Sequence, residues 1–358
     1  MQRPGSHGRK VNRRIRALEE RGTRRAVSRA EGSRLSSGQT TSELLGGLLP
    51  AMRAFAIPLR NRFRGITVRQ GALLHGPAGW GEFAPFAEYG PAESARWLAS
   101  AIEAATLGWP APVRSLIGVN STIPAVEPQV AYDIAARSGC RTAKVKVAEP
   151  GQGERDDLER VAAVRDALGR AGRIRMDANG SWDVKQAATM LWRLAGIGLE
   201  YAEQPCATLE ELTRLRSLVS VPLAADESIR KASDPLAVRA AGAADIVVLK
   251  VAPLGGVRNA LRIAAECGLP VVVSSAVDSS VGLAAGVALA AALPELRYDC
   301  GLGTMQMLTG DVTASSLLPD AGKLPVRAVH VDEQVLAAWE CDPRPWQDRA
   351  LAAAEFLT

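Results

Sequence analysis

The sequence is poor in histidine and has no clustered cysteines. Only three of its 358 residues are histidines (His7, His75 and His330), and its five cysteines include no Cys-x-x-Cys pair. Zinc and non-haem iron sites rely on such ligands, so both classes of metal site are disfavoured. Scattered single cysteines are typical of buried thiols in a reducing compartment, and we therefore expect a cytoplasmic protein.

Long hydrophobic runs are also missing. No uninterrupted apolar run reaches the roughly 18 residues that a membrane-spanning helix needs, and the alanine-rich stretch near 283–293 indicates a buried helix instead. The arginine-rich first residues lack the apolar core and cleavage site of a secretory signal. With 47% hydrophobic and 23% charged residues, the composition is that of a globular protein, and no membrane partner is expected.

The positive charge of the chain is concentrated at its N-terminus. Residues 1–40 contain 11 Lys and Arg against 3 Asp and Glu, whereas the remainder contains 32 against 35, a net charge of −3. A block of like charge with few apolar residues indicates a basic, disordered tail over residues 1–40. The alternative is nucleic-acid binding through the arginines. It is disfavoured because no aromatic side chains stand among them to stack on bases, so no nucleic-acid partner is expected.

A first folded segment, residues 41–112, has strands and helices that do not alternate. This pattern predicts a separate α+β domain. Its expected elements are a short helix at 42–52, extended runs at 54–58, 65–75 and 79–86, and an amphipathic helix at 91–107.

From residue 113 to 304, short apolar runs alternate with helical segments. Strands that are apolar almost throughout have both faces buried, and eight of them with intervening helices predict a closed βα barrel of the TIM type. The C-terminal segment 305–358 is expected to pack back on the first domain. The eight runs lie at 115–119, 142–147, 173–177, 198–203, 222–226, 245–250, 270–274 and the short 297–300.

Five ionisable residues stand at the ends of successive apolar runs: Lys146, Asp177, Glu203, Asp226 and Lys250. The steps between them are about 23 to 31 residues, the length of one strand, one helix and two loops. Because the C-terminal ends of parallel barrel strands meet at one mouth, the spacing predicts three carboxylates gathered between two lysines.

Such a group of side chains suits metal-assisted proton transfer. Carboxylate oxygens are the ligands that Mg²⁺ prefers, and we expect Mg²⁺, with Mn²⁺ as a substitute. A metal beside a substrate carboxylate stabilises the charge that develops when an α-proton leaves. A lysine can take that proton if its pKa is lowered, and Lys144, on the same strand face as Lys146, would lower it by like-charge repulsion.

Each residue also has an ordinary structural interpretation. A single Asp at a strand end is commonly the N-cap of the next helix, and a single Lys there is commonly a solvated charge at the rim. Independent caps would not also supply a Glu and two flanking lysines in this order, and the combined pattern therefore favours a functional site.

At these residues the chain resembles the enolase superfamily, in its muconate-lactonizing-enzyme subgroup. The resemblance spans about residues 54 to 305. It implies a capping domain on a modified (β/α)7β barrel, Mg²⁺ held by Asp177, Glu203 and Asp226, and Lys146 and Lys250 as the acid/base pair. The absence of a barrel histidine separates the chain from the mandelate-racemase branch. The matching motifs are Lys144-x-Lys146, Asp177-Ala178-Asn179, Glu203-Gln204-Pro205, Asp226-Glu227-Ser228 and Lys250.

Within the subgroup the chain is most similar to the o-succinylbenzoate synthase family of menaquinone biosynthesis. That family dehydrates 2-succinyl-6-hydroxy-2,4-cyclohexadiene-1-carboxylate to 2-succinylbenzoate through a magnesium-stabilised enediolate. The resemblance implies that Lys146 removes the α-proton and later protonates the departing hydroxide, while Lys250 stabilises the enediolate as a cation. The motifs are 62–67 (RFRGIT), 79–83 (GWGEF), 120–124 (NSTIP), 274–275 (SS) and 301–304 (GLGT).

The substrate is a dicarboxylate, and either Arg62 or Arg64 would pair with its succinyl carboxylate. The alternative is that both arginines lie on a solvated loop. Ser274 and Gly303 are further candidates for the same arm, and Lys144 and Asn179 complete the predicted substrate-binding set.

Two other functions stay open. N-succinylamino acid racemases and other enzymes of the subgroup use the same two lysines. Dipeptide epimerases of this subgroup usually carry an Asp-x-Asp motif at the eighth strand, which holds the ammonium group of their substrate. Asp299 is the only acidic residue in 297–304 of this chain, and this departure from the family disfavours a cationic dipeptide substrate. A scaffold or nucleic-acid-binding role is disfavoured by the negative net charge outside the tail. The sequence leaves the oligomeric state open and favours a monomer.

Overall fold

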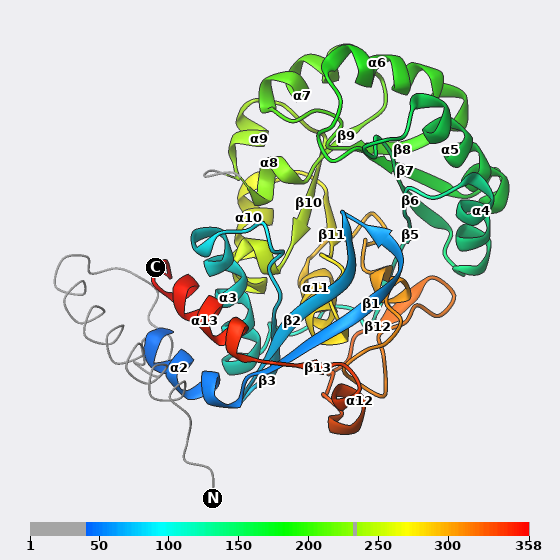
Figure 1. Ribbon diagram of the computed structural model, residues 1–358. Coiled ribbons are helices and arrows are strands. Elements are labelled where there is room, and N and C mark those ends of the chain that lie inside the picture. The colour runs from blue at the N-terminus through cyan, green and yellow to red at the C-terminus, as the bar shows by residue number, and fades with distance from the viewer. Residues whose placement is uncertain (1–40, 232–234, 358) are drawn as a thin grey trace, which may run out of the picture.

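The computed structural model describes residues 41–231 and 235–357 (Figure 1). The disordered tail predicted for residues 1–40 lies outside these residues. Within the described ranges, no helix combines the length and the apolar character needed to cross a membrane.

The N-terminal layer is an antiparallel sheet with helices packed on it, in agreement with the predicted α+β elements. Its strand order is β13-β1-β2-β3. A two-residue turn joins β1 to β2, with Arg64 at φ 49° and Gly65 at φ 77°, as hairpins that follow the right-handed strand twist require. The elements are α2 (Thr41–Leu48), η1 (Leu49–Ala51), β1 (Arg53–Phe63), β2 (Ile66–Gly76), β3 (Gly79–Phe83) and α3 (Pro91–Thr106).

The C-terminal segment returns to this layer. In Figure 1, α13 lies beside α3, and β13 continues the sheet next to β1. Ala350 and Leu351 of α13 are buried in one apolar cluster with Trp97 and Leu98 of α3. Burial of this apolar surface joins the two ends of the described chain. The C-terminal elements are β12 (Lys323–Pro325), α12 (Glu333–Ala337), β13 (Glu340–Cys341) and α13 (Arg344–Ala354).

The central layer is a curled parallel sheet with helices on its outer side (Figure 1). Its seven strands run in chain order, β5 to β11, as successive βα units produce. The strands are β5 (Ser121–Ile123), β6 (Thr142–Lys146), β7 (Arg173–Asp177), β8 (Leu199–Glu203), β9 (Leu223–Ala225), β10 (Ile246–Lys250) and β11 (Val271–Ser274). The helices are α4 (Pro128–Arg137), α5 (Glu154–Leu168), α6 (Val184–Arg193), α7 (Leu209–Arg216), α8 (Glu227–Arg230), α9 (Ala237–Ala240), α10 (Val257–Cys267) and α11 (Ser280–Ala292), with short turns η2 (Ala195–Ile197), η3 (Ala252–Leu254) and η4 (Gly303–Met307).

Two predicted barrel strands differ from the structure. The run 115–119 contains β4 (Leu116–Gly118), which pairs antiparallel with β12, and the first barrel strand is β5 instead. The run 297–300 does not form a strand; single parallel bridges join Cys300 to Val119 and Gly301 to Ser274.

Side-chain contacts explain why the eighth segment stays irregular. The carbonyl oxygen of Asp299 accepts a 2.7 Å hydrogen bond from Arg175 Nη1, and its carboxylate accepts one from Thr142 Oγ1. The first bond occupies a backbone carbonyl that a regular strand would direct to its neighbour, and the second holds the side chain of the same residue. The two bridges still close the sheet, which gives the modified βα barrel that the family resemblance implies.

Candidate active site

The strand ends bring the five predicted ionisable residues to one mouth of the barrel. Lys146, Asp177, Glu203 and Lys250 are the last residues of β6, β7, β8 and β10, and Asp226 directly follows β9. Lys146 pairs with Asp177 in the strand register, and Asp177 pairs with Glu203. All five side chains are buried.

Two lysines of β6 bind the carboxylates of the next two strands. Lys146 Nζ lies 2.6 Å from Asp177 Oδ2, and Lys144 Nζ lies 3.1 Å from the same oxygen. Lys144 Nζ also donates to Glu203 Oε1 at 2.9 Å. Alternation along the strand puts both lysines on its inner face, so one strand presents two cations to the mouth.

On the other side, Lys250 Nζ lies 2.5 Å from Asp226 Oδ2. The second oxygen of Asp226, Oδ1, accepts a 3.0 Å hydrogen bond from Arg230 Nε. Arg230 was not predicted from the sequence, although it stands four residues after Asp226 on α8, where helical side chains meet. Its Nη1 also donates to the hydroxyl of Tyr89, from the N-terminal layer, at 2.8 Å.

Burial and charge set the pKa values at the mouth. Burial lowers the pKa of Lys146, and Lys144 lowers it further, against the pull of Asp177. Burial also opposes the charge on Lys144, but the Glu203 and Asp177 carboxylates outweigh it and raise the pKa of Lys144. Burial and the Asp177 charge raise the pKa of Glu203 to about 7. The β6 lysines thus differ, with Lys146 the more easily deprotonated.

The backbone turns sharply just after several of these strands. Among the described residues, Ala148, Asn179, Gln204 and Val277 have positive φ although they are not glycines. They follow β6, β7, β8 and β11, respectively. Residues other than glycine adopt this conformation only when their surroundings impose it, and they cluster at functional sites.

The β1–β2 hairpin lies over the mouth, and its residues line a cavity there. Phe63, Arg64 and Phe86 line it from the N-terminal layer, and Lys146 and Lys250 line it from the barrel. The Phe63 ring lies 5.3 Å from Lys146 Nζ, close enough for a cation–π interaction. The cavity is therefore lined by cationic side chains from both layers.

The N-terminal layer and the barrel each match a known domain family. Residues 54–105 match a family described as enolase N-terminal domain-like, and residues 129–330 match one described as enolase C-terminal domain-like. The chain is 67% identical over 301 residues to o-succinylbenzoate synthase from Thermobifida fusca, which covers 84% of this chain and 95% of that protein. The chain belongs to the o-succinylbenzoate synthase family.

A second member of this family is more distant. The o-succinylbenzoate synthase of Mycolicibacterium smegmatis is 53% identical over 318 residues, covering 87% of this chain and 98% of that protein. Solved structures agree on the fold. Muconate lactonizing enzyme from Pseudomonas fluorescens has a TM-score of 0.71 at 23% identity, covering 81% of this chain and 98% of its own. An N-succinyl Arg/Lys racemase from Bacillus cereus has a TM-score of 0.70 at 20% identity, with coverage of 81% and 97%.

The predicted substrate-binding residues separate into two groups. Lys144, Asn179, Arg64 and Ser274 line the cavity. Asn179 Oδ1 also accepts a 2.6 Å hydrogen bond from Lys146 Nζ, and its Nδ2 donates to Glu227 Oε1 at 3.1 Å.

Arg62 and Gly303 lie away from the cavity. Arg62 is exposed, whereas Arg64 is half-buried, 4.4 Å from the centre of the Phe86 ring and 3.4 Å from Glu88. Gly303 is buried in η4, and its neighbours Gly301 and Thr304 line the cavity instead.

The carboxylates at the mouth are suitable ligands for a hard cation, although they do not form a complete coordination shell. Within residues 41–231 and 235–357, no three His, Cys, Asp or Glu side chains converge as a metal-ligand group, and Asp177 and Asp226 contact cationic side chains. Glu203 Oε2, however, is buried with no hydrogen-bond partner among the described residues. A buried oxygen of this kind is costly unless something binds it. Superfamily members generally use Mg²⁺, which this oxygen-only set suits.

Proposed function

We propose that the enzyme dehydrates 2-succinyl-6-hydroxy-2,4-cyclohexadiene-1-carboxylate to 2-succinylbenzoate, a step of menaquinone biosynthesis. Its membership of the o-succinylbenzoate synthase family supports this lyase activity. The structural observation that carries the proposal is the position of Lys146 on β6 and Lys250 on β10, which flank the carboxylates of β7, β8 and the β9 end.

Lys146 is the proposed base. Its lowered pKa favours the neutral amine, which accepts the proton from the carbon α to the substrate carboxylate. The electrons of that C–H bond move into an enediolate. The bond from the ring to the hydroxyl oxygen then breaks, and the proton on Nζ passes to that oxygen. Water leaves, and the ring becomes aromatic, which makes the second half of the reaction downhill.

Lys250 is the proposed electrostatic partner. It lines the cavity from the opposite side of the mouth, and its Nζ lies 2.5 Å from Asp226 Oδ2. A fixed cation beside the enediolate stabilises the transition state without having to reorganise during the reaction.

Asp177, Glu203 and Asp226 are the proposed ligands of Mg²⁺, or of Mn²⁺ in its place. When bound there, the metal stabilises the negative charge that builds up on the substrate carboxylate. Lys146 and Lys250 contact the same carboxylate oxygens that a metal would use, so metal binding would leave both Nζ atoms free for the substrate.

The charge of the cavity supports a dicarboxylate substrate. Lys144, Lys146, Lys250 and Arg64 all line it. We propose that Arg64 pairs with the succinyl carboxylate, because it reaches the cavity and Arg62 does not. Asn179, Ser274 and the backbone around Gly303 are proposed to complete the binding site.

We also propose that the enzyme acts as a monomer in the cytoplasm. Cys140, Cys206 and Cys300 are buried free thiols, which suits a reducing compartment.

The direct test is dehydration of the cyclohexadiene substrate with Mg²⁺ and after EDTA treatment, followed by the absorbance of the aromatic product. Turnover that needs Mg²⁺ is expected, and no turnover with Mg²⁺ would refute the assignment. Lys146→Ala and Lys250→Ala should each lower kcat by about 10²–10⁴-fold, the usual contribution of a positioned proton-transfer group. Solvent deuterium exchange at the α-carbon of an N-succinylamino acid measures any racemase reaction of the same two lysines.

A further inference from the structure

Val277 has an unusual backbone at the wall of the cavity. It has φ +60°, a region that β-branched residues rarely occupy, and its side chain is buried. It lies in the loop between β11 and α11, and this loop supplies Ser275, Ala276 and Val277 to the cavity lining. Such a conformation persists only where neighbouring groups impose it.

Arg69 of β2 is the group that holds this loop from the other layer. Its Nε donates a 3.1 Å hydrogen bond to the carbonyl oxygen of Val277. Its Nη1 and Nη2 donate to the carbonyl oxygens of Gln70 and Ala84 at 3.0 and 2.5 Å, and Nη2 lies 3.7 Å from Asp278 Oδ1. Only 2% of Arg69 is exposed, so its bonds are shielded from water.

The same guanidinium contacts both walls of the cavity. Arg69 lies 4.7 Å from the centre of the Phe86 ring, which lines the cavity from the N-terminal layer. Its bond to Val277 fixes the opposite wall, from the barrel. A single buried side chain therefore sets the position of one wall relative to the other.

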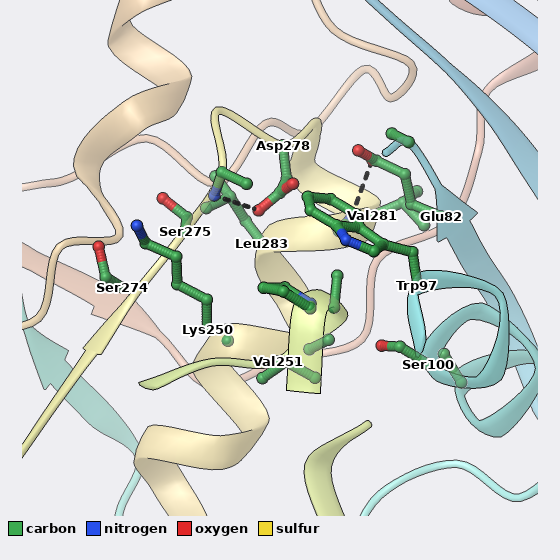
Figure 2. Close-up of a pocket in the computed structure, with 18 of the residues that line it drawn as sticks. Glu82, Trp97, Ser100, Lys250, Val251, Ser274, Ser275, Asp278, Val281 and Leu283 are labelled. Atoms are coloured by element: carbon green, nitrogen blue, oxygen red, sulfur yellow. Dashed lines mark hydrogen bonds between the residues drawn. The ribbon is translucent and has the colours of Figure 1, made fainter. Parts of the chain in front are cut away.

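Glu82 of β3 makes a second connection, at the start of α11. Its Oε2 accepts hydrogen bonds from Ser279 N at 3.1 Å, Ser279 Oγ at 2.5 Å and Gly282 N at 3.1 Å. A Cβ atom on Gly282 would lie 2.9 Å from that oxygen, so the contact needs glycine there. Figure 2 shows Glu82 on one side of the adjoining pocket, Lys250, Ser274 and Ser275 on the other, and Asp278 between them.

We propose that Arg69 and Glu82 are positioning residues for the reaction: from the N-terminal layer they hold the strained loop 275–279 in the shape that completes the cavity beside Lys250. The kcat measurements that test this role rest on the proposed dehydration. Neither residue touches the reacting atoms, so both act through the loop.

The central test is a cycle of Arg69→Met, Val277→Gly and the double variant, with kcat and KM measured for the Mg²⁺-loaded enzyme. Arg69→Met removes the hydrogen bond to the Val277 carbonyl oxygen, so the loop can relax. The kcat of this variant should fall by about tenfold or more, because misplacement of a site group by about 1 Å can cause a loss of this size. Glycine adopts φ +60° freely, so Val277→Gly should recover several-fold of that loss in the double variant. An unchanged kcat in Arg69→Met, or effects that simply multiply in the double variant, would overturn the proposal.

The role of Glu82 is tested by one conservative and one disruptive substitution. Glu82→Gln keeps an acceptor oxygen for Ser279 and Gly282 and should retain most of the kcat, whereas Glu82→Leu should not. Equal losses in both would contradict a role through these hydrogen bonds. Arg53→Met is the control, since Arg53 pairs with Glu333 and Glu340 at the far end of β1; it should lower the melting temperature and leave kcat unchanged.

Amide hydrogen exchange separates this proposal from the assignment of the reaction. Amides of residues 275–282 should exchange faster in Arg69→Met and Glu82→Leu than in the parent protein, whatever the enzyme turns over. Unaltered exchange would refute the positioning role of Arg69 and Glu82. An inactive parent protein with accelerated exchange in the variants would refute only the proposed reaction.

Discussion

The guanidinium of Arg230 donates a 2.8 Å hydrogen bond to the hydroxyl of Tyr89, and thereby connects the N-terminal layer to the barrel mouth. On its other edge Arg230 contacts Asp226 Oδ1 at 3.0 Å. A proposed metal ligand is therefore held indirectly by a residue that lies 137 positions earlier in the chain.

Tyr89→Phe should weaken metal binding without abolishing it. The variant removes the hydroxyl and keeps the ring, so Arg230 keeps Asp226 but loses a partner that fixes its orientation. Loss of an outer-shell contact typically costs about 10–100-fold in metal affinity, and we expect the lower end because Asp226 itself is intact. Titration of Mg²⁺ against initial rate gives the apparent affinity. Tyr132→Phe, at an exposed tyrosine on α4, is the control, and equal affinities in both variants would exclude this role for Tyr89.

Removal of the metal should lower stability as well as activity. A cation that binds only the folded protein stabilises it by RT ln(1 + [L]/Kd), and here it would also bind the unpartnered Glu203 Oε2. The melting temperature should therefore rise with Mg²⁺ concentration. The rise should vanish in Glu203→Gln, which replaces a charged ligand with a weak one. A Mg²⁺-dependent shift of the same size in this variant would show that the metal binds elsewhere.

The sequence was sufficient to predict the barrel and the side chains at its mouth. The period of the βα units puts Lys146, Asp177, Glu203 and Lys250 at strand ends, and parallel strands bring their ends together. The placement follows from local spacing alone. The roles of these residues remain proposals.

The sequence was insufficient wherever a contact joins distant segments. The hydrogen bond from Arg69 to Val277 connects residues 208 positions apart, and neither residue type predicts a contact with the other. The predicted strand 297–300 was wrong for a similar reason, because Arg175 of β7 binds the backbone carbonyl oxygen of Asp299. Short apolar runs specify a strand only when no such side-chain bonds compete for its backbone.

Arg64→Ala should raise KM much more than Arg62→Ala. Only Arg64 reaches the cavity, where a pair with the succinyl carboxylate would be shielded from water. A hydrogen bond to a charged group contributes about 1.5–3 kcal/mol, which corresponds to an increase in KM of roughly tenfold to a hundredfold. Arg62→Ala removes the same charge from the same hairpin and controls for long-range attraction. Similar KM values in the two variants would place the succinyl arm elsewhere.

The stability of the enzyme should fall between about pH 4.5 and pH 8 in a way that depends on Glu82. Burial raises the pKa of Glu82 to about 8, and Asp278 adds to the rise, while Arg69 and the donors from Ser279 and Gly282 oppose it. A carboxyl with a raised folded pKa holds its proton more tightly in the folded state. Its contribution is therefore fully present below the unfolded value of 4.5 and is lost as the pH rises through 8.

Urea unfolding of the parent protein and of Glu82→Gln at pH 5, 6, 7 and 8 measures this loss. The amide does not titrate, so the difference in unfolding free energy between the two proteins should shift in favour of the variant as the pH rises. Glu203, whose pKa is also raised, titrates in both proteins, and its contribution cancels in the difference. A difference that stays constant with pH would mean that Glu82 is already ionised in the folded protein at pH 5, held so by the three hydrogen bonds to its Oε2.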